Sequence, residues 1–307
     1  MKLCDYDALA GLAWPGECQE DLDAIRELRA STQERLKRRP DFFDFILKRT
    51  LPECAHASCT FTCPVIPKER IAWIGWGGKR PKTDHEREVL DLRDALAEVC
   101  WRHGEMDVDP QTLRSLHRTA ARTGAPRGAG RFRLGKARLA DEWPGHQGMA
   151  ELETLAAEEL PFAVERLCLA WTEASRRESV DGIMLAAAAV ADFVCMAPFA
   201  WGMGRMSRLL TSFLLCKAGV DPIACAFTNT SLHNAEEDYA DALAASCQGW
   251  REGTGDPMPF AAFLLWNVRD AYEIYEDGAA ALEVQRELSE AWNEREERGS
   301  SCCRKTP

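Results

Sequence analysis

The sequence lacks three features that would each indicate a particular class of protein. It has no excess of positive charge, since 38 Lys and Arg against 49 Asp and Glu give a net charge of −11. This balance argues against nucleic acid and membrane surfaces as partners. The longest apolar run, around residues 183–200, contains Asp192 and Pro198 and is too interrupted to span a membrane. Apolar and polar residues seldom alternate, so an extensive β-sheet is not expected.

We also expect no secretory signal, because the opening MKLCDYDALAGLAWPGECQ carries acids and a proline where an apolar stretch would be needed. The 13 cysteines are odd in number and too few for a disulfide scaffold in 307 residues. We therefore expect free cysteines and a reducing, cytoplasmic location. With 46% apolar and 28% charged residues, the composition indicates a globular fold rather than disorder.

Helical spacing of apolar residues dominates the chain and predicts an all-α fold of about eight helices. One helix includes Leu22 and Leu28, and another follows Thr83, which with Glu86 forms a capping-box pattern. Further helices are expected over 150–174, 183–196, a segment around 209–214, 234–247 and 259–296. Glycines between Arg127 and Leu139 predict a small β-hairpin. The chain divides into an N-terminal helical region (1–75), a core with C-terminal helices (76–296) and a disordered tail (297–307).

The segment 195–210 holds the most informative residues. An apolar helix leads into a loop with Gly202 and Gly204, and a second helix begins near Arg205. Glycines let backbone N–H groups surround an anion, and a helix N-terminus adds its dipole. Arg205 and Arg208 lie three residues apart on one helical face and suit a phosphate or carboxylate. Taken alone, the same pattern is also typical of a tight turn before a surface helix.

This segment, from Ala197 to Arg208, resembles the signature of the Fic-domain (Fic/Doc, AMP-transferase) family, His-Pro-Phe-x-Asp/Glu-Gly-Asn-Gly-Arg-x-x-Arg. The resemblance covers roughly residues 40–290 and includes three further segments in the family's order: Gly77–Leu90, Pro126–Arg133 and Leu214–Val220. It implies a Fic-type helical bundle with a β-hairpin flap that positions the substrate, here carrying Arg131, Phe132 and Arg133. It also implies transfer of AMP from ATP to a hydroxyl of a target protein.

The departures from the signature fall on the residues that carry the chemistry. Ala197 stands at the position of the general base, and a methyl group accepts no proton. Trp201 replaces the Mg²⁺ ligand, although magnesium requires oxygen ligands. Met203 replaces the phosphate-binding Asn and offers no hydrogen-bond donor. Ala197 alone could be an engineered inactivating change, but Trp201 and Met203 are not conservative knock-outs, so we interpret those two as native.

A second departure concerns the inhibitory helix that many Fic proteins carry, Ser-x-x-x-Glu-Gly/Asn, whose Glu reaches the second motif Arg. The matching stretch here begins at Ser58, and Thr62 stands where that Glu would be. The resemblance therefore implies that Arg208 lacks an internal carboxylate.

The catalytic residues stay unknown from the sequence, and two candidates remain. Cys195 precedes the altered motif by two residues, but its helix is expected to turn that thiol toward the core. His146 could replace the base only if its loop folded back over residue 197. His85 and His117 are expected at the surface or at helix ends.

Cysteines and a histidine also gather near the N-terminus, as Cys54, His56, Cys59 and Cys63. Thiolates and imidazole could bind Zn²⁺ or an iron–sulfur cluster. The spacing fits no standard zinc knuckle, so we expect free buried thiols and no metal there.

The sequence supports three hypotheses about function. The first is a Fic-fold protein that has lost AMP transfer, uses neither ATP nor Mg²⁺, and binds an acid-bearing small molecule. In this hypothesis Gly202, Gly204, Arg205, Arg208, Trp201 and Met203 form the ligand site of a fold repurposed for other chemistry. The second is a pseudoenzyme that binds a protein segment at the flap, and the third is a transferase that uses other residues. The oligomeric state stays open, a homo-oligomer included.

Overall fold

The computed structural model describes residues 4–177 and 179–302, and over these residues it contains helices, turns and loops but no strand. The prediction of an all-α fold is therefore confirmed. The α-helices are α1 (Gln19–Arg38), α2 (Pro40–Cys59), α3 (Lys68–Gly75), α4 (Asp84–Arg102), α5 (Pro110–Ala120), α6 (Leu139–Glu142), α7 (Gln147–Ala150), α8 (Leu160–Ala174), α9 (Gly182–Met196), α10 (Met203–Lys217), α11 (Pro222–His233), α12 (Glu236–Cys247) and α13 (Met258–Cys302). Among the described residues, no helix has the length and apolar character that crossing a membrane requires.

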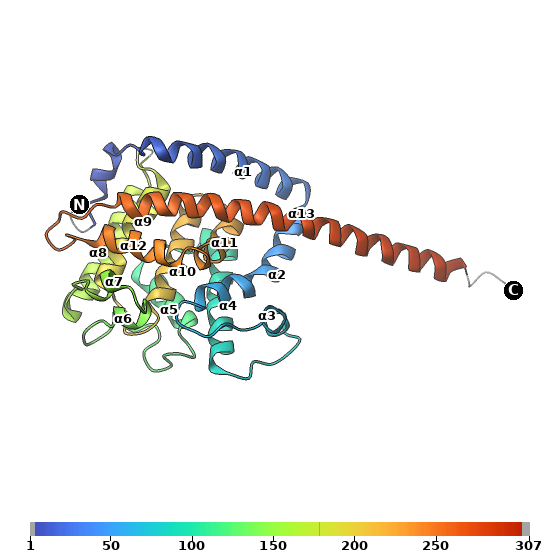
Figure 1. The fold of residues 1–307 in the computed structure, drawn as a ribbon, viewed down its shortest axis with the longest axis horizontal. Coiled ribbons are helices and arrows are strands. Elements are labelled where there is room, and N and C mark those ends of the chain that lie inside the picture. Colours follow the sequence, from blue (N-terminus) through green and yellow to red (C-terminus); the bar gives the residue numbers. More distant parts are fainter. Residues whose placement is uncertain (1–3, 178, 303–307) are drawn as a thin grey trace.

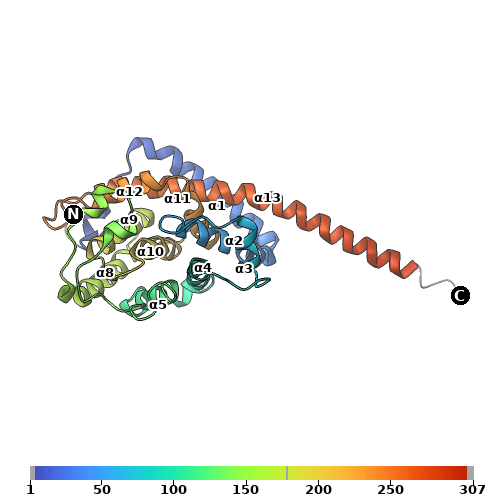
Figure 2. The same ribbon diagram turned by 60° about the horizontal axis from the view of Figure 1, so that its bottom comes forward.

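Helices α9 and α10 form the centre of the bundle (Figure 2). Asp181 caps α9 by accepting hydrogen bonds from the backbone N–H groups of Ile183 and Met184. Beyond its first turn α9 is entirely buried, because it packs against α8, α10, α12 and α13. Helix α10 is covered by α4, α5, α9 and α11. The connection between these two buried helices is consequently held on both sides by the core.

The N-terminal helices pack onto the same core rather than forming a separate one (Figure 1). Helix α2 packs against α4 and α11, and α1 lies along α13. Three side chains of α1 contact the carboxylate of Glu276 on α13, with Arg35 at 2.9 Å and Thr32 at 2.9 Å. A single cluster of buried apolar residues extends from Cys4 to Ala279. The boundary predicted near residue 75 therefore separates two sequence segments that share one core.

One carboxylate lies inside this core, on α9. Asp192 accepts hydrogen bonds from the backbone N–H of Cys4 (3.0 Å), the hydroxyl of Tyr6 (2.9 Å) and the indole N–H of Trp250 (2.7 Å). Burial raises the pKa of Asp192, and these hydrogen bonds oppose that rise. A buried carboxylate needs such donors. Asp192 therefore joins the N-terminal segment and the segment after α12 to the central helix.

Local signals in the sequence predicted several helix boundaries. Thr83 caps α4, since its hydroxyl accepts the backbone N–H of Glu86 at 3.2 Å. Pro161 lies in the first turn of α8, so it marks a start and not a kink. Helix α13 continues to Cys302, past the predicted start of the disordered tail at residue 297, and residues 303–307 lie outside the described residues.

The predicted β-hairpin between Arg127 and Leu139 is wrong, because that segment consists of turns and an extended loop. Its backbone groups bond elsewhere instead of pairing with one another. The N–H of Arg133 donates to the carbonyl of Pro198 at 2.9 Å, and the N–H of Gly130 donates to Nδ1 of His117 at 2.9 Å. These contacts attach the flap to the motif loop and to α5.

We expect Gly75→Ala to destabilise the protein. A Cβ at this position, the last residue of α3, would lie 2.4 Å from Cβ and Cγ of Pro52 on α2, so the two helices would have to separate. Overpacking of this kind costs about 1–3 kcal/mol. Chemical denaturation measures the difference, with Gly104→Ala as the control, because a Cβ there meets no atom within 4 Å. Equal losses in the two variants would contradict close packing between α2 and α3.

Candidate functional site

The turn between α9 and α10 is the structural centre of the site. Helix α9 ends at Ala197, whose backbone is left-handed with φ +44°, and α10 begins after Gly202, whose φ is +69°. A left-handed conformation is ordinary for glycine and strained for alanine. The N-terminus of α10 therefore presents its free N–H groups at the end of a sharply turned loop.

A carboxylate already occupies that N-terminus. Glu142, the last residue of α6, accepts the N–H of Gly202 through Oε1 at 2.6 Å and the N–H of Gly204 through Oε2 at 3.2 Å. Its side chain is buried, with 7% of the residue exposed. A Cβ on residue 204 would lie 3.2 Å from the carbonyl oxygen of Glu142, so glycine permits this approach. The loop predicted to bind an anion thus binds one from its own chain.

The guanidinium of Arg205 lies on the other side of the loop. Its Nη1 forms a salt bridge with Oε2 of Glu88 on α4, at 3.0 Å. Its Nε is buried and has no hydrogen-bond partner among the described residues. Arg205 is therefore partly satisfied and keeps one donor for a further acceptor.

Arg208 is buried more deeply, with 1% of the residue exposed. It donates to the hydroxyl of Ser58 at 2.8 Å and to the carbonyl of the same residue at 2.9 Å, and it lies 4.0 Å from the ring centre of Phe61. Burial lowers its pKa. Its Nη1 is buried without a partner among the described residues. The stretch that begins at Ser58 lies against Arg208, as the family resemblance implies, and it supplies a hydroxyl and a carbonyl.

The three replaced motif positions have different surroundings. Ala197 and Met203 are buried in the core, whereas half of Trp201 is exposed (50%). The guanidinium of Arg138 lies 5.6 Å from the ring centre of Trp201. Trp201 therefore lies at the opening of the site, and the buried Met203 is not among the side chains that line the neighbouring cavity.

A cavity of about 250 Å³ opens beside the loop. It is lined on the motif side by Trp201, Gly202 and Arg205, and Asp141 and Glu142 form another part of its wall. The remaining lining comes from the segment after α2, from α4 and from the segment after α5: Thr62, Cys63, His85, Glu88, Ala121, Gly124 and Ala125. The cavity therefore brings cationic, acidic and thiol side chains to one place.

His117 is a part of the site that the sequence analysis placed wrongly at the surface, since only 2% of it is exposed. Its ring stacks on Phe199 at 3.7 Å between centres and 2° between planes. Nδ1 accepts the N–H of Gly130, so Nε2 carries the proton and donates it to the carbonyl of Trp201 at 2.8 Å. Burial lowers the pKa of His117 to about 4. The histidine is neutral, and both of its nitrogens hold backbone groups.

The flap residues differ in what they contact. Arg133 is buried and does not face a ligand: its guanidinium donates to the carbonyls of Ala197 (2.7 Å) and Met196 (3.2 Å) at the end of α9. A cation at a helix C-terminus is favourable. Phe132 packs against Phe199, with 5.8 Å between ring centres, and Arg131 is exposed. Of the three, Arg131 alone is available to a partner.

Neither of the two candidates for a nucleophile or base lies in the cavity. Cys195 is buried in the core, as expected, and burial raises the pKa of its thiol well above the usual range. His146 lies at the start of α7 and is not among the side chains that line the cavity.

The sequence-predicted cysteine cluster is divided by the fold. Cys54 and Cys59 are buried, and burial raises the pKa of each thiol to about 12. His56 accepts the backbone N–H of Ile66 through Nε2 at 3.0 Å. Cys63 is one turn beyond Cys59, and its thiol lies beside His85 and Glu88 of α4.

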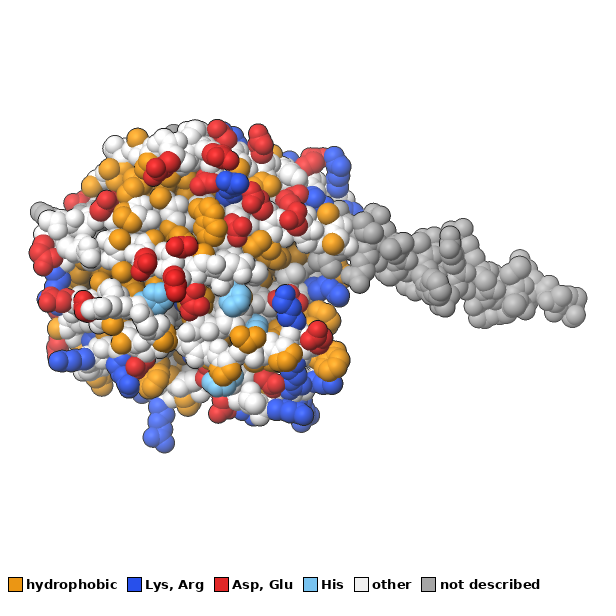
Figure 3. Space-filling model, viewed as in Figure 1, with side chains coloured by type: hydrophobic (Ala, Val, Ile, Leu, Met, Phe, Trp, Pro, Cys, Tyr) orange, Lys and Arg blue, Asp and Glu red, His pale blue; other side chains and the backbone are white. Residues whose placement is uncertain are grey.

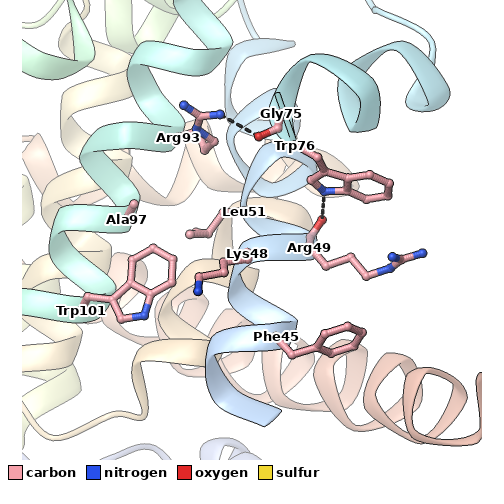
Figure 4. A pocket seen from close by; sticks show the side chains of 9 residues that line it. All are labelled: Phe45, Lys48, Arg49, Leu51, Gly75, Trp76, Arg93, Ala97 and Trp101. Carbon is pink, nitrogen blue, oxygen red and sulfur yellow. Dashed lines mark hydrogen bonds between the residues drawn. The ribbon is translucent and has the colours of Figure 1, made fainter. Parts of the chain in front are cut away.

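Among the other hollows outside the motif, two differ in the character of their lining. A largely apolar cavity of about 470 Å³ lies between α2, α3 and α4, with the indoles of Trp76 and Trp101 at its two sides and Lys48 between them (Figure 4). A wider groove of about 1000 Å³ follows α5 and the flap, and five arginines line it: Arg114, Arg118, Arg122, Arg127 and Arg131. In Figure 3 acidic side chains spread over the upper part of the visible face and most basic ones lie toward its lower edge.

Residues 107–215 match the sequence profile of the Fic/DOC family. This span contains the flap, α9, the turn with Ala197 and Gly202, and most of α10. No curated protein is significantly similar to the chain in sequence.

Solved structures share the fold beyond that span. A Fic family protein from Desulfovibrio desulfuricans G20 superposes with a TM-score of 0.62 at 19% identity, covering 87% of this chain and 76% of that one. Fic-1 from C. elegans gives 0.60 at 17% identity, with 86% and 73% covered. A Fic domain containing signaling protein from Bacteroides thetaiotaomicron gives 0.59 at 16% identity, with 84% and 98% covered. At these identities the likeness concerns the fold.

We expect His117 to make the protein less stable in mild acid. Its pKa is about 4 in the folded chain and about 6.5 when unfolded. As the pH falls through this interval the unfolded chain takes up a proton that the folded chain does not. The free energy of unfolding should then fall by up to about 3 kcal/mol.

Denaturation curves at several pH values between neutrality and pH ~4.5 measure this loss. His117→Gln removes the titrating group, so its stability should fall less steeply than that of the wild type. His85→Gln, an exposed position, serves as the control and should keep the wild-type slope. Parallel curves for the wild type and His117→Gln would contradict the buried neutral histidine.

Proposed function

We propose that this Fic-domain protein does not transfer AMP and that it binds a small molecule with a carboxylate or another anionic group in the cavity beside Trp201 and Arg205. The observation that carries the proposal is a pair of buried guanidinium nitrogens without partners, Nε of Arg205 and Nη1 of Arg208, next to a loop that already binds a carboxylate. Leaving a buried donor unpaired costs about 1–3 kcal/mol. An acidic ligand in the cavity would complete the hydrogen bonds of Arg205, whose side chain lines it.

The residues around the loop do not fit ATP and Mg²⁺. The indole of Trp201 offers no oxygen to a magnesium ion, and the methyl group of Ala197 accepts no proton. The imidazole of His117 cannot replace the base, because both of its nitrogens are engaged with backbone groups. Loss of a general base alone costs about 10²–10⁴-fold in rate. We derive no AMP-transfer step for this chain.

Glu142 also affects how an anionic ligand can bind. Its carboxylate holds the two amides that an anionic ligand would use, so ligand binding in the loop requires Glu142 to leave. The work of displacing it lowers the apparent affinity for the ligand. Glu142 therefore selects for ligands that also contact Arg205 or Trp201.

A second candidate function, a protein-interaction module, is favoured by the arginine groove along α5 and the flap. Arg122 is paired with Asp91 and Asp94, whereas Arg118, Arg127 and Arg131 form no ion pair with a described residue. These three cations on a chain of net charge −11 suit an acidic segment of another protein.

The double variant Arg127→Glu with Arg131→Glu should abolish binding of a polyglutamate peptide, while the double variant Arg127→Lys with Arg131→Lys keeps it.

We expect calorimetry with Mg-ATP to show no binding in the millimolar range, and radiolabelled ATP to transfer no label to protein. The reason is the missing metal ligand at Trp201 and the carboxylate already in the loop. Tight, magnesium-dependent ATP binding with label transfer would contradict the proposal.

Native mass spectrometry after mild purification should show a retained small molecule. Arg205→Ala should lose this mass, because it removes the guanidinium that faces the cavity. Arg87→Ala, on the exposed face of α4, is the matched control and should retain it. An empty wild-type protein, unchanged by either variant, would favour the interaction module.

We expect Glu142→Ala to open the anion loop. Inorganic phosphate should then bind to the variant, through the freed N–H groups of Gly202 and Gly204, at least about tenfold more tightly than to the wild type. Calorimetry measures the affinities, and Glu151→Ala, an exposed glutamate of the same region, is the control. Equal phosphate affinities in Glu142→Ala and the wild type would contradict the role given to Glu142.

A further inference from the structure

Three side chains with metal-binding atoms converge at the cavity beside the motif loop. Cys63 lies just after α2, and its backbone N–H donates to the carbonyl of Cys59 at 2.9 Å. His85 and Glu88 lie three residues apart near the start of α4, so they share one face of that helix. The thiol, an imidazole nitrogen and a carboxylate oxygen all lie within 4.8 Å of one another.

We propose that Cys63, His85 and Glu88 form a binding site for one Zn²⁺ ion. Thiolate, imidazole and carboxylate together are ligands that zinc accepts, while Mg²⁺ and Ca²⁺ prefer oxygen alone. Three protein ligands with an open fourth position are typical of zinc sites that act on a ligand or on water. The proposal requires neither the small molecule nor the anion loop, because the three ligands come from the segment after α2 and from α4.

The ligand atoms need only a small side-chain movement to reach bonding distance. Around a tetrahedral zinc ion, sulfur, nitrogen and oxygen ligands lie roughly 3.3–3.6 Å apart. The thiol of Cys63 is already 3.5 Å from Oε2 of Glu88. His85 is exposed, so packing does not oppose rotation of its ring. Binding would take the thiol proton from Cys63 to solvent and form the sulfur–zinc bond, with no change of oxidation state.

A neighbouring cation holds the carboxylate in position. Oε2 of Glu88 accepts a hydrogen bond from Arg205 at 3.0 Å, which is the kind of contact that orients a metal ligand. The other oxygen, Oε1, lies close to Gly124, where a Cβ would be 3.1 Å away, so glycine at this position permits the approach of the carboxylate.

The charges also balance. Thiolate and carboxylate together neutralise Zn²⁺, and the guanidinium of Arg205 shares the cavity wall with the carboxylates of Asp141 and Glu142. The open coordination position would face the cavity that Trp201 and Gly202 line. Water or an anion of a ligand would complete the coordination.

Zinc titration of the full chain, monitored by competition with a chromophoric chelator, tests the site. The protein carries Cys302→Ser and Cys303→Ser, which removes two thiols that are adjacent in the C-terminal part of the sequence. It is treated with a chelator before the titration. We expect one zinc ion per chain. His85→Gln, at an exposed position, and Cys63→Ser should each lower the affinity at least about tenfold.

The sequence-predicted ligands are the matched controls. Cys54→Ser and His56→Gln should leave the zinc affinity unchanged, because neither side chain lies in the cluster. Cobalt in place of zinc should give a thiolate-to-cobalt absorption band that Cys63→Ser abolishes and Cys54→Ser retains. Absence of stoichiometric zinc binding, or loss of it in the Cys54 and His56 variants but not in His85→Gln, would overturn the proposal. Because the probe is the metal alone, this result is separate from the test of small-molecule binding.

Discussion

The hydrogen bonds from Gly202 and Gly204 to the carboxylate of Glu142 are the interaction on which the rest of the site depends. A helix that begins inside a protein leaves N–H groups that require acceptors, and a buried carboxylate requires donors. Each satisfies the other here, so the loop after α9 is stable without a ligand. The same amides are the donors that the anion of a ligand would use. The carboxylate of Glu142 and such a ligand would therefore compete for these two N–H groups.

The two arginines of the motif, Arg205 and Arg208, have different hydrogen-bond partners. Arg205 is paired with Glu88, whereas Arg208 rests on a hydroxyl, a carbonyl and the ring of Phe61. A buried guanidinium is costly unless hydrogen bonds satisfy it. The apolar residues Ala197 and Met203 are not among the hydrogen-bond partners of these arginines.

Local patterns predicted several helices, among them α4, α8 and α9, but not α2 or α11, and they predicted the contacts between distant segments poorly. The cap at Thr83 and the start at Pro161 follow from neighbouring residues, and the family resemblance located the turn at 197–208. The flap forms no hairpin because its backbone partners, Pro198 and His117, lie elsewhere in the chain. Glu142 lies 60 residues before the amide of Gly202, so no spacing rule could find it. Cys63 was grouped with neighbours along the chain, whereas its nearest metal-binding side chains lie on α4.

The carboxylate of Asp192 also constrains the order in which the chain can fold during synthesis. Its donors come from residues 4 and 6, which precede it in the chain, and from Trp250, which follows it. Tyr6 is 186 residues from Asp192, and Trp250 is 58 residues from it. Residues 4 and 6 therefore cannot complete these hydrogen bonds until α9 has left the ribosome, and Asp192 gains its third donor only when the loop after α12 follows. Folding of this core is consequently a late event, governed by contacts between distant parts of the chain.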